Sequence, residues 1–134
     1  MKQIRCDVAI IGAGSAGLSA YRAARTAGKH AVLIEGGPYG TTCARVGCMP
    51  SKLLISAAEA AHALQVAPGF GVHPGTVRID GPAVMDRVRR ERDRFTGFVV
   101  GNIEELPAAD KIRGYARFAA PGRLLVDDHT EVHA

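Results

Sequence analysis

The sequence is poor in aromatic residues and carries no strong excess of one charge. Only 5% of its 134 residues are aromatic, and the formal net charge is +4. Proteins that bind nucleic acid usually combine a basic surface with aromatic rings on which bases stack. Neither ingredient is concentrated here, so nucleic acid is not an expected partner.

Long apolar runs are absent as well. The N-terminal residues lead into a short apolar stretch that contains two glycines. This stretch has neither the cleavage site of a secretory signal peptide nor the roughly 20 apolar residues of a membrane span. We therefore expect no membrane association and a cytoplasmic location. A hydrophobic fraction of 47% and a charged fraction of 22% fit one soluble globular domain.

Cysteine is scarce. The chain has an odd number of cysteines, three, which are Cys6, Cys43 and Cys48. In a chain without a secretion signal, an odd count argues against a structural disulfide framework and favours catalytic, redox or buried free thiols. Cys6 is interpreted as a small residue at the start of a strand. The spacing of the other two differs from zinc-binding motifs, so no metal site is predicted.

The first forty residues have the pattern of a βαβ unit. Residues 7–11 form an apolar run that ends at glycine, which predicts a central strand buried on both faces of a parallel sheet. The Ala-rich segment that follows, from Leu18 to Thr26, predicts a helix that stops at Gly28. Residues 30–35 are the next apolar run. The crossover between the two strands is expected to be right-handed.

The turn between the first strand and the helix has the glycine spacing of a dinucleotide-binding motif. Gly12 permits the tight turn, Gly14 lets the backbone approach a pyrophosphate, and Gly17 lets the helix pack closely on the strand. Amides around Ser15 and Ala16 would face the phosphates. The helix N-terminus adds partial positive charge at that point, so no basic side chain is needed.

Glu35 completes this motif. It lies 18 residues beyond Gly17, at the end of the second predicted strand, where a carboxylate accepts hydrogen bonds from ribose hydroxyls. The motif by itself does not distinguish FAD from NAD, and a Gly-rich turn without a ligand is the alternative.

The remainder of the chain is predicted to hold two long helices and a small sheet. A helix over 42–64 is interrupted near Gly47 and Pro50, and a Pro/Gly-rich connection follows. A second helix is expected from Pro82 to Glu105. Three short runs then predict an antiparallel meander, at residues 111–118, 123–126 and 130–132.

The charged stretch 86–94 within the second long helix resembles an anion-binding patch at first sight. However, Asp86 and Arg90, and likewise Arg87 and Glu91, are spaced four residues apart. Arg89 and Asp93 have the same spacing. Pairs at this distance support one another on a helix surface, so a solvated helix face is the favoured interpretation.

Cys43 and Cys48 lie five positions apart, just after the nucleotide motif. In a regular helix this spacing separates Cα atoms by roughly 8 to 9 Å, whereas a disulfide requires less than about 7 Å. Pairing therefore demands a departure from helical geometry, which Gly47 allows. The alternative is two unrelated buried cysteines.

Cysteines in the first turns of a helix have lowered pKa values, because the helix dipole favours the thiolate that attacks disulfides. We therefore expect a lowered thiol pKa at this pair. Lys52 lies four residues after Cys48 and could stabilise negative charge on a thiolate or a flavin. Together these residues predict a reactive, reversible dithiol.

The order of these motifs, from Gly12 through Glu35 and the cysteine pair to Lys52, resembles the N-terminal part of the flavin-dependent pyridine nucleotide-disulfide oxidoreductases, and dihydrolipoamide dehydrogenases most of all. The resemblance is specific over residues 5–54. Farther on, the segment around Tyr115 is similar to the family segment whose backbone contacts the adenine end of FAD.

The resemblance implies roles for individual residues. Cys43 would be the thiol that exchanges with substrate, and Cys48 the thiol that faces the flavin. Electrons would pass between NAD(P)H, FAD and this pair, with a small-molecule or protein-bound disulfide as substrate, in a homodimeric parent enzyme. The implied contacts to FAD are Gly12, Gly14, Ser15, Ala16, Gly17, Glu35, Gly36, Gly40, Thr41, Thr42, Lys52 and Ala116.

Alternative parents within the family stay open. Ser51 favours the lipoamide and mercuric reductase patterns over glutathione reductase, where lysine is common. The lack of a preceding cysteine-rich module disfavours mercuric reductase. Two residues depart from the family pattern, because Thr41 stands where glycine is usual and Arg45 where asparagine is frequent.

We predict an α/β fold, a partial Rossmann-like FAD-binding domain with a parallel sheet and flanking helices, plus a small antiparallel meander. Residues 1–106 would hold the βαβ core, the redox helix and the long helix, and residues 107–134 the meander. The NAD(P) and interface domains of the family are not visible, so a fragment that is inactive alone is expected. A stand-alone nucleotide-binding or redox-sensing module is the other reading.

Overall fold

The computed structural model describes residues 1–134, and the chain forms two compact units. The first comprises residues 1–41 and 98–134, and the second comprises residues 42–97. The α/β class predicted from the sequence is confirmed, with a parallel sheet and helices in the first unit.

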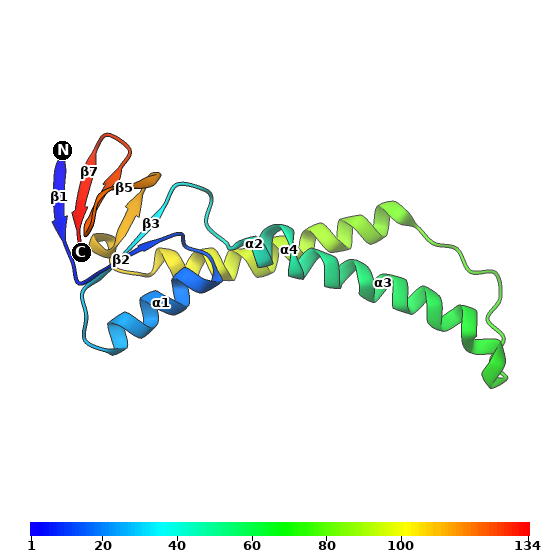
Figure 1. The fold of residues 1–134 in the computed structure, drawn as a ribbon. Coiled ribbons are helices and arrows are strands. Elements are labelled where there is room, and N and C mark those ends of the chain that lie inside the picture. The colour runs from blue at the N-terminus through cyan, green and yellow to red at the C-terminus, as the bar shows by residue number, and fades with distance from the viewer. The chain divides into compact units, whose positions relative to one another are not determined.

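The first unit contains the predicted βαβ arrangement. Strand β2 (Val8–Ile11) leads into helix α1 (Ser15–Thr26) and then strand β3 (Ala31–Glu35), which pairs with β2 in parallel (Figure 1). A third parallel strand, β4 (Lys111–Arg113), joins β3 on its other side. The order β2-β3-β4 makes β3 central, so the prediction of a central position for the first strand is wrong.

The second sheet of this unit is the predicted meander with an additional strand. Strands β5 (Ala116–Ala120), β6 (Arg123–Val126) and β7 (Thr130–His133) pair antiparallel. Strand β1 (Lys2–Arg5) adds to β7 in parallel, which the sequence pattern did not predict. The single strand expected over 111–118 is also wrong, because the chain turns at Gly114, whose φ is +141°, and its two halves join different sheets.

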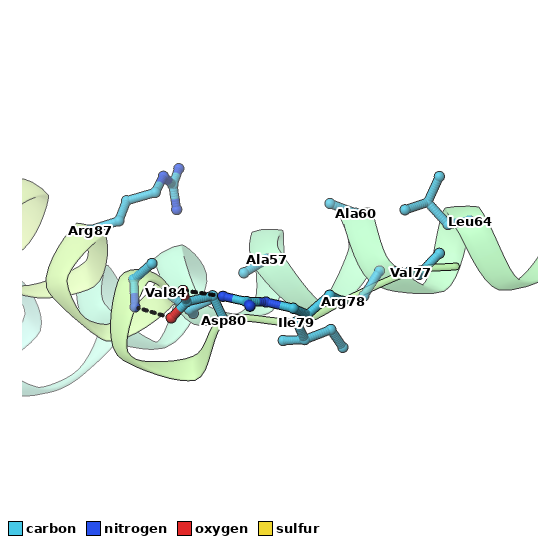
Figure 2. A pocket seen from close by; sticks show the side chains of 11 residues that line it. Ala57, Ala60, Leu64, Val77, Arg78, Ile79, Asp80, Val84 and Arg87 are labelled. Carbon is cyan, nitrogen blue, oxygen red and sulfur yellow. Dashed lines mark hydrogen bonds and ion pairs between the residues drawn. The ribbon is translucent and has the colours of Figure 1, made fainter. Parts of the chain in front are cut away.

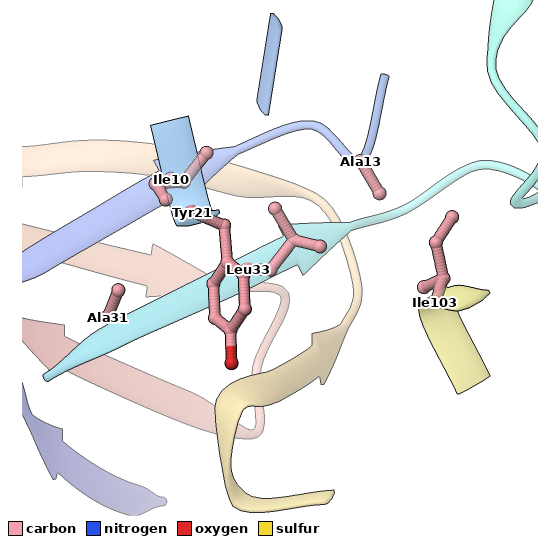
Figure 3. Close-up of a cluster of buried hydrophobic side chains, with 6 residues drawn as sticks. All are labelled: Ile10, Ala13, Tyr21, Ala31, Leu33 and Ile103. Carbon is pink, nitrogen blue, oxygen red and sulfur yellow. The ribbon is translucent and has the colours of Figure 1, made fainter. Parts of the chain in front are cut away.

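Strand β3 separates two hydrophobic clusters. Successive side chains of a strand point to opposite faces. Ala31 and Leu33 accordingly belong to one cluster, with Ile10, Ala13, Tyr21 and Ile103 (Figure 3). Val32 and Ile34 belong to the other, with Ile112, Leu124, Val126 and Val132. All four of these β3 residues are at most 1% exposed, so the strand that ends at Glu35 is held firmly on both faces.

A buried polar network fastens α1 to the short helix η2 (Ala108–Asp110). The Tyr21 hydroxyl donates to Asp110 Oδ2 at 2.6 Å. Arg25 and His30 lie 3.9 and 3.7 Å from the same carboxylate. Burial, followed by the hydrogen bond to Asp110, raises the pKa of Tyr21 to about 12. The neutral phenol is therefore part of the native packing.

We expect alkaline pH to destabilise the first unit through Tyr21. A raised folded-state pKa gives stability that is complete below the ordinary value of 10.0 and is lost as the pH rises toward about 12. A difference of about two pKa units corresponds to about 3 kcal/mol. Tyr21→Phe should remove this alkaline dependence, as measured by urea unfolding at neutral pH and above pH 10. Tyr115→Phe, at a 71% exposed tyrosine, is the matched control and should leave the dependence intact.

The second unit begins with two helices that meet at Gly47. Helix α2 (Thr42–Val46) ends there and α3 (Cys48–Val66) begins at the next residue. The predicted interruption at Gly47 is confirmed, but the one at Pro50 is wrong. Pro50 is the third residue of α3, where a backbone N–H would have no intrahelical acceptor, so proline is tolerated.

The short helix η1 (Ala67–Phe70) follows α3 directly. A segment without helix or strand then leads to α4 (Gly81–Glu104). Asp80 caps α4 by accepting a hydrogen bond from the Ala83 N–H at 3.1 Å. Arg87 of α4 donates to the Leu53 carbonyl and the Ser56 hydroxyl of α3, each at 3.3 Å. None of the helices has the length and apolarity needed to cross a bilayer.

The ion pairs on the charged face of α4 differ from the predicted ones. Arg89 pairs with Asp86 and Arg94 with Glu91, both three residues apart, whereas Arg90 and Arg92 pair with the acidic residue that follows each. The three predicted pairs at four-residue spacing are wrong. Arg89 and Arg90 pair with acidic residues at shorter spacing, and Arg87 donates to α3 instead.

Candidate functional site

Only glycine is permitted at one position in the loop between β2 and α1 and at one position in the first turn of α1. Gly12 has a φ of +98°, and its N–H donates to the Ile34 carbonyl at 2.7 Å. A Cβ on Gly17 would strike the Gly12 carbonyl oxygen. A Cβ on Gly14 would instead meet nothing within 4 Å. The loop is therefore tightly closed at Gly17 and open at Gly14, where a ligand can approach the backbone.

The start of α1 presents backbone donors to this open space. The first helical hydrogen bond runs from the Leu18 N–H to the Gly14 carbonyl at 2.9 Å. The N–H groups of Ser15, Ala16 and Gly17 precede that bond and have no acceptor within the helix. Together with the helix dipole, such donors favour a phosphate or another anion.

Glu35 lies at the end of β3 and braces this loop. Its Oε2 accepts from the Ala13 N–H at 2.8 Å, and its Oε1 accepts from the Gly37 N–H at 2.7 Å. Each carboxylate oxygen retains a second lone pair, so the group can still accept from a ligand hydroxyl. The sequence predicted only the ligand contact and missed the two backbone bonds.

Tyr115 forms a second wall that the sequence did not single out as a site residue. A Cβ on Gly36 would lie 2.6 Å from the Tyr115 ring, so only glycine lets the ring rest on this backbone. The Tyr115 N–H donates to Asp127 Oδ1 at 3.2 Å, yet its side chain is 71% exposed. Ala116 follows as the first residue of β5. The result is an exposed aromatic face beside Glu35.

Two further predicted site residues, Gly40 and Thr41, have positive φ angles of 113° and 61°. Thr41 is one of the two departures from the family pattern. A β-branched residue is strained in this left-handed region, which glycine adopts without cost. Glycine, which is usual at this position in the family, avoids the backbone strain that Thr41 carries in this chain.

The two cysteines adjoin the break between α2 and α3. Gly47 has φ −120° and ψ −103°, far from helical values, and a Cβ there would lie 3.3 Å from the Thr42 carbonyl oxygen and 3.6 Å from Cys43 Cα. This close approach brings Cys48 back toward Cys43, and the Cys48 side chain has the largest influence on the pKa of the Cys43 thiol. The predicted departure from helical geometry is confirmed.

The environment raises the pKa of the Cys43 thiol. The hydrogen bond to the Cys48 side chain is the largest cause, because Cys43 loses that bond as a donor on ionisation. Partial desolvation and the charge of Cys48 act in the same direction, while the Cys48 N–H and Lys52 oppose them. The expectation of a lowered pKa is wrong for Cys43, because a facing thiol outweighs the helix terminus.

The predicted site residues thus fall into two groups. The glycine loop, Glu35, Gly36, Gly40, Thr41 and Ala116 belong to the first unit. Thr42, Cys43, Cys48 and Lys52 belong to the second. The first group can hold a dinucleotide by its phosphate and ribose, and the second can form and break a disulfide.

A protein-family model described as pyridine nucleotide-disulphide oxidoreductase matches residues 6–119. A mercuric reductase of Streptomyces lividans is 45% identical over 59% of this chain and 17% of its own length. A dihydrolipoyl dehydrogenase of Thermus scotoductus is 31% identical over 92% of this chain and 26% of its own length. The chain therefore spans about a fifth of the length of these relatives.

A solved structure has the same fold. It is a copper(II) complex of the HOCl-induced flavoprotein disulfide reductase RclA from Escherichia coli, with a TM-score of 0.68 and 26% identity. The match covers 100% of this chain and 27% of that protein. Dihydrolipoyl dehydrogenases and mercuric reductases occur together among the relatives, so the comparisons do not separate these two parents.

Proposed function

Because the chain belongs to the pyridine nucleotide-disulphide oxidoreductase family, whose members use FAD and NAD(P)H, we propose that it is the N-terminal FAD-binding part of a thiol-disulfide oxidoreductase. The observation that carries this proposal is the break at Gly47, where a Cβ would lie 3.6 Å from Cys43 Cα, so that Cys43 and Cys48 lie beside each other instead of at helical spacing. FAD, when bound, supplies the two-electron chemistry that links NAD(P)H to this pair.

The first unit would hold FAD through its backbone. The N–H groups at the start of α1 bind the pyrophosphate, and Gly14 leaves the space for it. Glu35 accepts from the ribose hydroxyls while its bonds to Ala13 and Gly37 keep the loop in place. The path of the cofactor in this unit is lined by Gly36, Gly40, Thr41 and Ala116.

The cysteine pair performs the exchange with substrate. The Cys43 thiolate attacks a substrate disulfide, which forms a mixed disulfide and releases one substrate thiol. Cys48 then attacks the Cys43 sulfur, so the second substrate thiol leaves and the Cys43–Cys48 disulfide forms. One disulfide is thus reduced to two thiols while the cysteine pair loses two electrons and two protons. Lys52 stabilises the thiolate charge.

The whole protein would be a cytoplasmic homodimer that acts on a disulfide in a small molecule or a protein, in the manner of a dihydrolipoamide dehydrogenase. The second unit supports a dimer because no residue of α3 is buried, although the helix is rich in apolar side chains. A groove of about 410 Å³ runs beside it, lined by Ala57, Ala60, Leu64, Val77, Ile79 and Val84 among others (Figure 2). Free thiols fit a reducing compartment.

The proposal is tested on the purified chain with FAD and a disulfide. FAD is expected to raise the melting temperature and to lose fluorescence on binding. Oxidation by a small disulfide should lower the mass by two hydrogens, a change that a Cys43→Ser variant does not show. A chain that binds no FAD and forms no internal disulfide would refute the proposal, whereas FAD binding without the disulfide would leave only a nucleotide-binding module.

A further inference from the structure

The second unit contains another cavity, at the junction of α2 and α4. It has a volume of about 280 Å³ and is lined by Arg45, Val46, Arg92, Asp93 and Thr96. Arg92 and Thr96 are four residues apart and therefore lie on one face of α4. Arg45 is the second departure from the family pattern, and neither the nucleotide motif nor the cysteine pair requires it.

The polar groups around this cavity are incompletely satisfied. None of the ion pairs of the chain involves Arg45. The Thr96 hydroxyl oxygen is buried and has no hydrogen-bond partner. Because almost none of the surface of that oxygen is accessible, it does not line the open cavity, and the group available to a ligand is the Arg45 guanidinium.

Arg92 is turned toward the cavity, unlike the other arginines of its helix. Its side chain is 34% exposed, compared with 60% for Arg89, 67% for Arg90 and 73% for Arg94. Its guanidinium contacts Asp93 Oδ1 at 2.7 Å. Two guanidinium groups and one carboxylate leave a net positive lining. The solvated-face interpretation thus holds for Arg89, Arg90 and Arg94, whereas Arg92 is partly covered.

The cavity does not serve the cysteine chemistry directly. Side chains two positions apart on a helix diverge by about 200°, so Arg45 and Cys43 point to opposite sides of α2. Lys52 is among the charges that act on the Cys43 thiol, whereas Arg45 is not. A group bound at Arg45 is therefore separate from a disulfide at Cys43.

We propose that this cavity binds a small tetrahedral oxyanion, either free inorganic phosphate or the phosphate group of a small metabolite. Arginine presents a planar fork of donors that suits phosphate oxygens, and Arg45 and Arg92 offer two such forks from different helices. The bound anion bridges α2 and α4 and so steadies the helix that carries Cys43. This site is independent of the proposed oxidoreductase function.

The test is calorimetric titration of the full chain with inorganic phosphate at constant ionic strength, with chloride as the reference salt. Arg45→Gln and Arg92→Gln are expected to weaken binding, the first by about tenfold or more because a charge-assisted bond is lost. Asp93→Asn should bind several-fold more tightly, since a repelling carboxylate disappears. A phosphorylated sugar that binds more tightly than phosphate would identify a metabolite as the source.

Arg89→Gln on the same helix is the matched control and should bind phosphate as the parent chain does. Arg45→Lys should restore part of the affinity, which separates charge from a packing role. The proposal is overturned if phosphate does not bind, or if binding is indifferent to Arg45 and Asp93. Formation of the Cys43–Cys48 disulfide in these variants is measured separately, so failure of the phosphate site is distinguishable from failure of the proposed function.

Discussion

Gly17→Ala is expected to destabilise the first unit by about 3 kcal/mol and to abolish measurable FAD binding. The added Cβ would collide with the Gly12 carbonyl oxygen, which is backbone and cannot rotate away. Overpacking against an immobile neighbour typically costs about 1–3 kcal/mol or more. Relief requires the start of α1 to move off β2, and that movement displaces the N–H groups proposed for the pyrophosphate. Urea unfolding and FAD fluorescence titration measure the two effects.

Two other glycines give the matched controls. Gly101→Ala adds the same methyl group to the interior of α4, where nothing lies within 4 Å, so it should stabilise the chain by about 1 kcal/mol. The Cβ added by Gly14→Ala would also have no protein atom within 4 Å. This variant should therefore leave stability nearly unchanged while weakening the binding of FAD. Equal stability of the Gly17→Ala variant and the parent would contradict the packing argument.

The parts of the fold that depend on short stretches of sequence could be predicted. The apolar run before Gly12, the glycine spacing and the apolar run before Glu35 together specify a βαβ unit, because each element is determined within about ten residues. The break at Gly47 was also predictable, since five-residue spacing of two cysteines cannot form a disulfide in a regular helix.

Long-range pairing could not be predicted in the same way. Strand β4 has only three residues, and its place beside β3 depends on the turn at Gly114, where φ is +141°. Strand β1 pairs with β7 across almost the whole chain, so no local pattern announces it. The position of a strand within a sheet is a property of all its partners, which explains why β2 was wrongly expected to be central.

The same distinction between local sequence signals and long-range contacts applies to the candidate site. The role of Gly17 follows from a motif, whereas the exposed face of Tyr115 depends on contact between segments about eighty residues apart. The bonds from Glu35 to Ala13 and Gly37 add a supporting role that the motif does not contain. The prediction of a lowered pKa for Cys43 was wrong because it considered only the helix terminus and not the neighbouring Cys48 side chain.

Cys48→Ala is expected to abolish the internal disulfide and to shift the reactivity of Cys43 toward lower pH. Its sulfur is the largest cause of the raised pKa of Cys43, so its removal leaves the backbone N–H of residue 48 and Lys52 to favour the thiolate. At neutral pH a larger fraction of Cys43 is then ionised, and alkylation by iodoacetamide accelerates several-fold. The rate is measured against pH in a Cys6→Ser background. With a disulfide reagent, the variant retains a mixed adduct that the parent chain expels.

Lys52→Gln provides the opposite change in the same assay. The ammonium group of Lys52 lowers the pKa of Cys43, so its loss should move the pH profile of alkylation upward. The raised pKa also means that the thiol hydrogen bond stabilises the fold below the ordinary thiol value of 9.0 and ceases to do so as the pH rises through the folded value. Profiles that shift in the same direction in the two variants, or that coincide with the parent profile, would show that the sulfur of Cys48 does not control the proton of Cys43.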